Sequence, residues 1–590
     1  MTGKPSIDRP WLKFYPEGAD NIQFPEMTAY QFLYERTKEE MGGIALEYYG
    51  AKISRAAFFR KIDETAKALT AFGVKSGDVV TVMLPNIPEA VYCLYALNKI
   101  GACANMLGPI YESKHIAESI DFTESKIIVI LDQFYNTLDR EIEKTKTEKI
   151  VIVSPFISLP AVLRMAAVLK EKLKVKSPAI PRSDRCIGWK GFIKTGQKQK
   201  DVLQAPYQKD TPAVIVYSSG STGANKGIVL ANEALVNLTV QGEAQNGLNC
   251  QNLQLKKSCV IVPMFISTGL NLVLGFALNF KVTADLVPQY ESGVFVKNVI
   301  KNHPDVVIAT TGLFESFVDL DDNLDDNIDL SKLIFALTGG ESLPIDLENR
   351  LNQFFERHNS KARMLQGWGM CEFGSVVTTT EWDNPESKGV GKPMAKTIIG
   401  IFDLDTDEEL GYNERGEIRV ITPCRMLGYY KNPEATAAFF RKGKDGQIWG
   451  CSGDMGYMDE DGNVFVEGRA NDYIPGKNGN KFWLFDIEKI ILADEAVQFC
   501  AAVGFSADDR HIPAAHLVLK QDCTEKPEEV IRRVHESCVK SLLSEAVPRR
   551  YKIRGRFNVL PSGKRDTRSL KDERDGFYEV EGDEVKEVEV

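Results

Sequence analysis

The sequence predicts an α/β protein with a largely parallel β-sheet, because helical and strand patterns alternate in its first half. Apolar residues at helical spacing run through residues 54–72, and a buried-strand pattern follows at 79–84. A second helical pattern occupies 89–101, and short β-branched runs recur at 127–131 and 150–153. Helices that alternate with short apolar strands are typical of parallel sheets covered by helices.

Length and composition limit the classes of protein that we consider. A chain of 590 residues is longer than one ordinary domain, so we expect a large body and a smaller unit. Hydrophobic residues make up 43% and charged residues 26%, which is typical of a soluble globular protein. The net charge of -10 argues against nucleic-acid binding, because binding phosphates requires a basic face. Residues 1–20 lack the apolar core of a secretory signal, so a cytoplasmic location is expected.

Two segments carry strongly patterned charge. Residues 159–176 combine an apolar face with several lysines, and we interpret them as a solvated helix packed on the body. Peripheral contact with an anionic membrane is the alternative for this helix. Residues 575–590 are acidic and are predicted to form a solvated tail. No pattern in the sequence indicates an oligomeric state.

A segment rich in glycine and serine follows the strand-like run 213–216 and reads YSSGSTGANKG from Tyr217 to Gly227. Glycines let backbone N–H groups turn toward an anion, hydroxyls add donors, and a lysine supplies positive charge. The segment is not a Walker A loop, because Lys226 is not followed by serine or threonine. We predict a phosphate-binding loop that uses Ser218, Ser219, Gly220, Ser221, Thr222, Gly223 and Lys226.

This loop resembles the YTSGTTGxPKG signature of the ANL superfamily of adenylate-forming enzymes, which includes acyl-CoA synthetases, peptide-synthetase adenylation domains and luciferases. Further blocks that resemble the family occur in the family order over nearly the whole chain. Two precede the loop, Gly77-Asp78 and Leu84-Pro85-Asn86, and the others follow it at residues 263–269, 337–341, 367–372, 452–454, 468–469 and 560–566. The resemblance implies a large N-terminal body of two Rossmann-like α/β subdomains plus a β-barrel, over residues 1–470. It also implies a small, mobile α+β C-terminal domain over 471–574, with the hinge at Asn471 and the acidic tail at 575–590.

The resemblance assigns the nucleotide contacts residue by residue. A glycine-rich turn would lie against adenine, an aromatic ring would stack on it, and an aspartate would accept hydrogen bonds from both ribose hydroxyls. An arginine would add a second ribose or phosphate contact. The turn against adenine contains Gly340 and Glu341, and the stacking ring is Trp368, in the block with Gly369 and Cys371. The ribose-binding aspartate is Asp454, and the arginine is Arg469. Cys371 stands where the family has a threonine that contacts phosphate, and a thiol is the weaker donor.

The same resemblance assigns the catalytic groups. Lys564 would contact both the α-phosphate and the incoming carboxylate, as an electrostatic clamp in a reaction that brings two anions together. Glu372 would hold Mg²⁺ together with the phosphates. The family's small domain rotates between the two half-reactions, and Gly479 would lie on the path of coenzyme A. Pro475 stands where many relatives have a lysine, and Lys477 is a candidate substitute.

Residues 263–269 resemble one wall of the acyl pocket, with Phe265, Ile266 and Gly269 as its site residues. Amino-acid-activating relatives place an aspartate beside the aromatic residue to pair with the α-ammonium group, and Ile266 cannot do so. Many acyl-CoA synthetases carry histidine at the Ile266 position. We therefore expect a carboxylic acid without an α-amino group, with a medium- or long-chain fatty acid ahead of an aryl or polycyclic acid.

Together these patterns predict an ATP-dependent acyl-CoA synthetase, an AMP-forming acid–thiol ligase of fatty acid metabolism that uses ATP, Mg²⁺ and coenzyme A. Its partners would be the small carboxylic acid, ATP and coenzyme A. One alternative is a fatty-acyl-AMP ligase that loads a carrier protein. A second alternative is a nucleotide-binding regulatory homologue without catalysis, suggested by Cys371, Ile266 and Pro475.

Overall fold

The computed structural model describes most of the chain, and its contacts divide the chain into two compact units. The first unit comprises Met1–Gly400, Arg419–Cys451 and Met458–Val464, and the second comprises Ile401–Ile418, Ser452–Tyr457 and Phe465–Val590. The described residues are 2–109, 113–159, 163–165, 184–217, 226–246, 254–320, 328–382, 384, 387–444, 446–476, 480–507, 510–520, 523–558, 565–567, 569–582 and 584–588.

An eight-stranded sheet in the first unit has the strand order β19-β9-β8-β4-β3-β5-β6-β7. Its strands are β3 (Val79–Met83), β4 (Cys103–Met106), β5 (Ile127–Leu131), β6 (Lys149–Val153), β7 (Cys186–Gly188), β8 (Pro212–Tyr217), β9 (Gly227–Ala231) and β19 (Gly428–Tyr429). The pairs from β8 through β7 are parallel, whereas β9 is antiparallel to both β8 and β19. Every residue of β5 is buried, as expected for a strand covered by helices on both faces.

A nine-stranded sheet in the same unit has the order β16-β15-β14-β13-β12-β10-β11-β1-β2. Its strands are β1 (Ile44–Tyr48), β2 (Ala51–Ser54), β10 (Lys257–Val260), β11 (Thr283–Leu286), β12 (Val306–Ala309), β13 (Phe335–Gly339), β14 (Met364–Met370), β15 (Ser375–Thr379) and β16 (Lys392–Pro393). The pairs from β14 through β1 are parallel, and β2, β15 and β16 join antiparallel.

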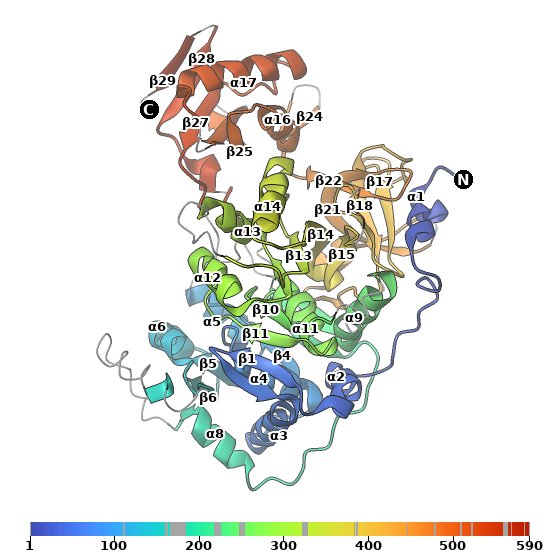
Figure 1. The fold of residues 1–590 in the computed structure, drawn as a ribbon, viewed down its shortest axis with the longest axis vertical. Coiled ribbons are helices and arrows are strands. Elements are labelled where there is room, and N and C mark those ends of the chain that lie inside the picture. The colour runs from blue at the N-terminus through green and yellow to red at the C-terminus, as the bar shows by residue number, and fades with distance from the viewer. Residues whose placement is uncertain are drawn as a thin grey trace. The chain divides into compact units, whose positions relative to one another are not determined.

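Helices connect these strands, and several begin at residues whose chemistry favours a helix start. α2 has a capping box in which Thr28 and Gln31 satisfy each other's backbone N–H groups, and α4 has proline in its first turn. α8 packs against α3 in Figure 1, with an edge contact between Phe72 and Phe192. The helices of this unit are α1 (Pro5–Asp8), η1 (Pro10–Phe14), α2 (Ala29–Thr37), η2 (Lys38–Glu40), α3 (Arg55–Ala71), α4 (Pro88–Lys99), α5 (Ser113–Phe122), α6 (Asp132–Glu143), α8 (Trp189–Gly196), α9 (Asn232–Asn246), η3 (Thr268–Leu274), α11 (Gly275–Asn279), α12 (Ser292–Asn302), α13 (Thr311–Asp319), α14 (Ile345–Arg357), η5 (Cys371–Phe373) and α15 (Pro433–Phe439).

The predicted α/β class, with two mainly parallel sheets, is confirmed. The predicted helices at 54–72 and 89–101 are α3 and α4, and the predicted strands are β3, β5, β6 and β8. Most of the predicted helix at 159–176 lies outside the described residues. Among the helices that the structure describes, none is both long and apolar enough to span a bilayer.

A five-stranded sheet has the order β17-β18-β21-β20, with β22 beside β21. It lies in the part of the chain where the family resemblance implies a β-barrel. Its strands are β17 (Ile398–Phe402), β18 (Gly416–Ile421), β20 (Phe440–Lys442), β21 (Ile448–Met458) and β22 (Val464–Arg469).

The second unit has its own core beneath the five-stranded sheet β25-β26-β27-β28-β29. α16 and α17 pack on this sheet through Ile487, Ile491, Val530 and Val534, which are all fully buried, and Figure 1 shows α17 alongside β28. The elements of this part are β23 (Tyr473–Pro475), β24 (Lys481–Trp483), α16 (Leu484–Ile491), β25 (Val497–Ala507), β26 (Arg510–Leu519), α17 (Pro527–Ser541), β27 (Arg550–Arg554), η7 (Ser569–Asp572), β28 (Phe577–Glu581) and β29 (Glu584–Val588).

The acidic end of the chain is folded, which corrects the prediction of a solvated tail at 575–590. β28 and β29 form a hairpin that extends the sheet at β27. Phe577 and Val580 are only 1% and 9% exposed, and Arg550 forms an ion pair with Glu579. The acidic residues stand between apolar ones, so the composition concealed the two-residue period of a strand.

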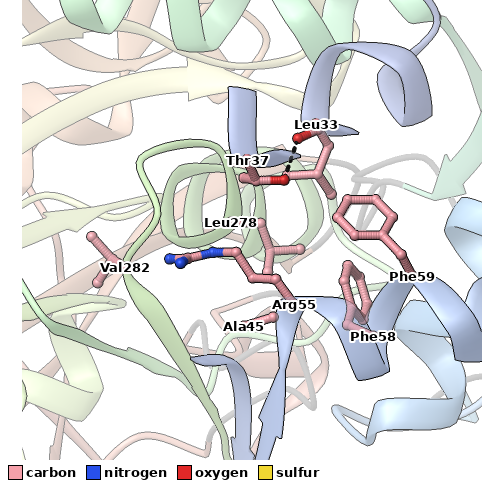
Figure 2. A pocket seen from close by; sticks show the side chains of 8 residues that line it. All are labelled: Leu33, Thr37, Ala45, Arg55, Phe58, Phe59, Leu278 and Val282. Atoms are coloured by element: carbon pink, nitrogen blue, oxygen red, sulfur yellow. Dashed lines mark hydrogen bonds between the residues drawn. The ribbon is translucent and has the colours of Figure 1, made fainter. Parts of the chain in front are cut away.

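A small pocket of the first unit lies where α2, α3 and α11 meet. Figure 2 shows Arg55 among apolar side chains that include Phe58, Phe59 and Leu278. The guanidinium of Arg55 donates to the backbone carbonyls of Glu40 and Lys281, at 3.2 and 2.5 Å. Burial lowers the pKa of Arg55 from its ordinary value. Because both donor groups reach backbone oxygens of other segments, Arg55 stabilises the fold at this junction.

Candidate active site

The strand that leads into the predicted phosphate-binding loop is anchored by a buried polar network. At the end of β8, the hydroxyl of Tyr217 donates to Asn105 Oδ1 at 2.9 Å. Asn105 Nδ2 in turn donates to the hydroxyl of Thr81 at 2.9 Å and contacts that of Thr123 at 3.3 Å. These groups are buried, so the network fixes the point at which the loop begins. The predicted loop residues Ser218, Ser219, Gly220, Ser221, Thr222 and Gly223 lie outside the described residues.

Lys226, which ends the loop, and Glu372 meet at one tyrosine. The hydroxyl of Tyr429 donates to Glu372 Oε1 at 2.9 Å, and Lys226 Nζ lies 5.0 Å from the centre of the same ring. Glu372 is 6% exposed and lies in η5, directly after β14. Its backbone carbonyl accepts a hydrogen bond from Met426 N at 2.8 Å. The structure therefore brings together the predicted phosphate-binding cation and the predicted metal carboxylate.

The arrangement around Glu372 fits Mg²⁺ bound to a nucleotide. Among the described residues, no group of three or more His, Cys, Asp and Glu side chains is placed to hold a metal ion. Mg²⁺ in nucleotide sites is usually held by one or two carboxylates, with phosphate oxygens and water supplying the remaining ligands. One buried glutamate matches that pattern. Cys371, the neighbour of Glu372, is partly buried.

The predicted adenine-binding residues lie at the ends of two adjacent parallel strands. β13 and β14 pair in a register that places Gly339 opposite Gly367. Gly340 and Glu341, which follow β13, are thereby brought next to the strand that carries Trp368 and Gly369. Trp368 is 8% exposed, so packing fixes the orientation of its ring. The carboxyl ends of parallel strands are the usual place for ligands in open α/β sheets.

The predicted acyl wall is held by Asn86, from the Leu84-Pro85-Asn86 block. The Asn86 amide donates to the carbonyls of Val260 and Val262, each at 3.0 Å, and its oxygen accepts from Met264 N at 3.1 Å. Asn86 is buried, and it links the segment after β3 with the turn after β10. This block of the sequence thus shapes the backbone that carries Phe265.

The ring of Phe265 packs directly on a glycine. A Cβ atom added to Gly108 would lie 2.7 Å from Phe265 Cδ2 and 2.8 Å from Cε2, so only glycine allows this approach. Phe265 itself is buried. Gly108 follows β4 and precedes residues 110–112, which lie outside the described residues.

The remaining predicted acyl-wall residues lie at the start of a π-helix. Ile266 is partly buried, and Gly269 is buried in the π-helix η3. π-Helical turns are rare and are frequent at functional sites. From the same helix, the amide of Asn271 donates to the carbonyl of Gly374 at 3.0 Å, two residues beyond Glu372. The predicted acyl wall is therefore tied to the predicted metal-binding segment within the first unit.

The second unit brings together Asp454, which is predicted to contact ribose, and Arg469, which is predicted to contact ribose or phosphate. Arg469 Nη1 lies 2.9 Å from Asp454 Oδ1 and donates to the carbonyl of Ser452 at 3.1 Å. Ala470 N donates to Gly453 O at 2.8 Å, so the two segments are also held through their backbones.

The predicted hinge residue, Asn471, is exposed and follows the buried Ala470. The indole N–H of Trp483 donates to Ala470 O at 3.3 Å. Lys477 and Gly479 of the adjoining loop, and the predicted catalytic Lys564, lie outside the described residues. Their roles, and that of Asn471, stay predictions.

Sequence reasoning missed Tyr429, Asn105 and Gly108. Tyr429 lies in the run Gly428-Tyr429-Tyr430-Lys431, whose aromatic pair beside a glycine was the available signal. Asn105 is a polar residue within an apolar strand pattern, and buried polar side chains of that kind are hydrogen-bonded to specific partners. Nothing in the sequence around Gly108 indicated its contact with Phe265, because that contact depends on the tertiary fold.

Comparisons with known proteins match most of the chain. The model of the AMP-binding enzyme family matches residues 33–430. The chain is 26% identical over 576 residues to a long-chain-fatty-acid–CoA ligase of Bacillus subtilis, covering 96% of this chain and 98% of that protein. It is also 26% identical over 482 residues to a probable 4-coumarate–CoA ligase 1 of Dictyostelium discoideum, covering 80% and 82% of the two chains.

A solved structure shows the same fold. ATP-bound MatB from Rhodopseudomonas palustris superposes with a TM-score of 0.75 at 19% identity. The match covers 92% of this chain and 99% of that one.

Proposed function

Because this chain belongs to the AMP-binding enzyme family and is an AMP-forming acid–thiol ligase, we propose that it converts a medium- or long-chain fatty acid into its coenzyme A thioester. The observation that carries the proposal is the contact of Lys226 and Glu372 with one side chain, Tyr429. A cation at the end of the predicted phosphate-binding loop and a buried carboxylate thus contact the same ring, and both groups would suit Mg²⁺–ATP.

In the first half-reaction, a carboxylate oxygen of the fatty acid attacks the α-phosphorus of ATP and pyrophosphate leaves. Two anions approach each other, so positive groups must be in place before the reaction begins. Lys226 binds the β- and γ-phosphates, and Lys564 contacts the α-phosphate and the carboxylate. Glu372 would hold Mg²⁺, which would supply positive charge to the triphosphate.

In the second half-reaction, the thiol sulfur of coenzyme A attacks the acyl carbonyl carbon of the acyl-adenylate. The bond between that carbon and the phosphate-linked oxygen breaks, AMP leaves with the oxygen, and the thiol proton passes to solvent. Asp454 and Arg469 bind the ribose through both steps. The thiolate is the reactive form of the thiol, so this step is expected to be faster at higher pH.

The residues of the predicted acyl wall favour an apolar acid. Phe265 is buried against Gly108, and Ile266 supplies no charge to pair with an α-ammonium group. A buried ammonium group without a partner would be strongly unfavourable. The Bacillus subtilis relative is named for long-chain fatty acids and the Dictyostelium relative for 4-coumarate, so aryl acids are the competing substrate class.

The test is an ATP–pyrophosphate exchange panel with fatty acids of increasing chain length, aryl acids and amino acids. Each reaction is repeated with coenzyme A, and the thioester is detected by mass spectrometry. We expect exchange with fatty acids and formation of their coenzyme A thioesters. Exchange led by aryl acids or amino acids would refute the proposed acid class.

The same panel separates the two other candidate functions. Exchange with fatty acids but no thioester unless a carrier protein replaces coenzyme A would identify a carrier-loading ligase. ATP binding without exchange for any acid would identify a regulatory homologue.

A further inference from the structure

Tyr429 contacts both charged groups that the proposed function requires, and the inference below rests on that function. Its hydroxyl donates to Glu372 Oε1 at 2.9 Å, and its ring centre lies 5.0 Å from Lys226 Nζ. Glu372 is buried, so this hydrogen bond forms away from bulk water, where it is strengthened. Neither the phosphate-binding loop nor the segment after β14 contains Tyr429, which belongs to β19.

The backbone around Tyr429 joins those two segments. β19 pairs antiparallel with β9, the strand that leaves the phosphate-binding loop, and Tyr429 lies opposite Ile228. Tyr430 N donates to Gly227 O at 2.7 Å, directly after Lys226. On the other side, Met426 N donates to the carbonyl of Glu372 at 2.8 Å. The short segment 426–430 is therefore hydrogen-bonded through its backbone to the segment that carries Lys226 and to the segment that carries Glu372.

The side chain of Tyr429 is held by its neighbours. Its backbone N–H bonds the hydroxyl of Thr436 at 2.9 Å, and the ring of Phe439 meets its ring edge-on at 6.1 Å. Gly428 has φ +153°, and a Cβ atom there would lie 2.8 Å from Thr436 Cγ2. Glycine at this position therefore allows α15 to approach β19 closely enough to fix the tyrosine.

A carboxylate that binds a metal through one oxygen needs the other oxygen to be fixed. A hydrogen bond from a second residue supplies this constraint, and loss of such a partner typically lowers metal affinity by about ten- to a hundredfold. An aromatic face also attracts an ammonium group and restricts its position.

We propose that Tyr429 is a positioning residue that sets the geometry of Mg²⁺–ATP binding, with its hydroxyl orienting Glu372 and its ring orienting Lys226. These two functions are separable by mutation.

Tyr429→Phe keeps the ring and removes the hydroxyl, whereas Tyr429→Leu removes both. Tyr430→Phe is the matched control, because the ring of Tyr430 packs edge-on against Phe122 and not on Lys226.

The measurement is the affinity of the full-length protein for ATP, determined by calorimetry with excess Mg²⁺ and again with EDTA. The ratio of the two affinities reports the contribution of the metal without requiring turnover. We expect Tyr429→Phe to reduce this ratio by about tenfold with the metal-free affinity unchanged. Tyr429→Leu should reduce the ratio similarly and also weaken metal-free binding, because Lys226 loses the ring.

A wild-type ratio in Tyr429→Phe would overturn the proposal. Equal loss of metal-free and metal-bound affinity in Tyr429→Phe, with a lower melting temperature, would show a structural role and would overturn it too. Tyr430→Phe should match the wild type in every measurement. The proposed function fails separately, if wild-type protein binds Mg²⁺–ATP more tightly than ATP but makes no acyl-coenzyme A.

Discussion

Arg469 and Asp454 form an ion pair of 2.9 Å within the second unit, and the two side chains differ in exposure. The Asp454 side chain is 14% exposed and that of Arg469 is 47% exposed. Arg469 also donates to the carbonyl of Ser452, so the guanidinium is positioned by two acceptors. The pair holds a carboxylate oriented before any ligand binds, and a preoriented acceptor reduces the cost of binding a ribose diol.

Asp454→Asn should weaken ATP binding, because an amide is a poorer acceptor for two ribose hydroxyls than a carboxylate. We expect KM for ATP to rise by roughly ten- to a hundredfold, the usual effect of losing hydrogen bonds to a charged group. The sharper measurement is the preference for ATP over 2′-deoxy-ATP, which should fall in the variant. An unchanged preference would show that Asp454 does not contact the 2′-hydroxyl, and Asp461→Asn serves as the control at an exposed aspartate.

Asn86→Ala should destabilise the protein and alter its response to the acid substrate. The substitution removes the partner of the Val262 carbonyl and of the Met264 N–H, so we expect a loss of about 2–4 kcal/mol in the free energy of unfolding. Urea unfolding measures this loss. The Val260 carbonyl also loses the Asn86 amide but keeps the hydrogen bond from Val287 N. In the folded variant, KM for the fatty acid should rise more than KM for ATP. Equal changes in both constants would contradict the link between Asn86 and the acyl wall, and Asn21→Ala is the exposed control.

The Glu89 carboxyl should make stability depend on pH near neutrality. Burial raises the pKa of Glu89 to about 7, although the Ser158 hydroxyl donates to it at 2.5 Å. Because this pKa exceeds the ordinary value of 4.5, the folded protein binds the proton more tightly than the unfolded chain. The stabilisation is complete below about pH 4.5 and is lost as the pH rises through about 7.

Glu89→Gln removes this dependence. Relative to the variant, the wild type should lose up to about 3 kcal/mol in free energy of unfolding between pH 5 and pH 8. Urea titrations at several pH values measure the difference. A difference that does not change with pH would contradict the raised pKa, and Glu17→Gln is the control substitution at an exposed glutamate.

Lys564→Ala should separate the two half-reactions. Loss of a preorganised positive group typically removes about 3–4 kcal/mol of transition-state stabilisation, which is two to three decades in rate. Pyrophosphate exchange should fall by that factor, whereas thioester formation from supplied acyl-adenylate and coenzyme A should remain. Lys571→Ala, at an exposed lysine of η7, is the control. Equal loss of both steps would contradict the role of Lys564.

Much of the fold of the first unit could be predicted from local patterns. α3, α4 and β5 follow from the spacing of apolar residues, because an element covered by others records its buried face in its own sequence. The C-terminal hairpin of β28 and β29 could not be predicted in this way. Its acidic residues resemble those of a tail, and only pairing with β27 shows which apolar residues are buried.

Individual residues of the candidate site could be predicted from the sequence, but the contacts between them could not. Glu372 and Lys226 stood out by their motifs, whereas Tyr429 did not. Its contact with Glu372 joins residues 57 apart in the sequence. Contacts of this kind depend on how β19 pairs with β9, and strand pairing between distant segments is not recorded in local periodicity.

The most direct test of adenylate formation is the fate of a carboxylate oxygen. A fatty acid labelled with oxygen-18 in both carboxyl oxygens is incubated with wild-type protein, ATP, Mg²⁺ and coenzyme A, and the products are analysed by mass spectrometry. If the acid attacks the α-phosphorus and the thiol then displaces AMP, each AMP carries one labelled oxygen. Unlabelled AMP, or label in inorganic phosphate instead, would contradict an acyl-adenylate intermediate.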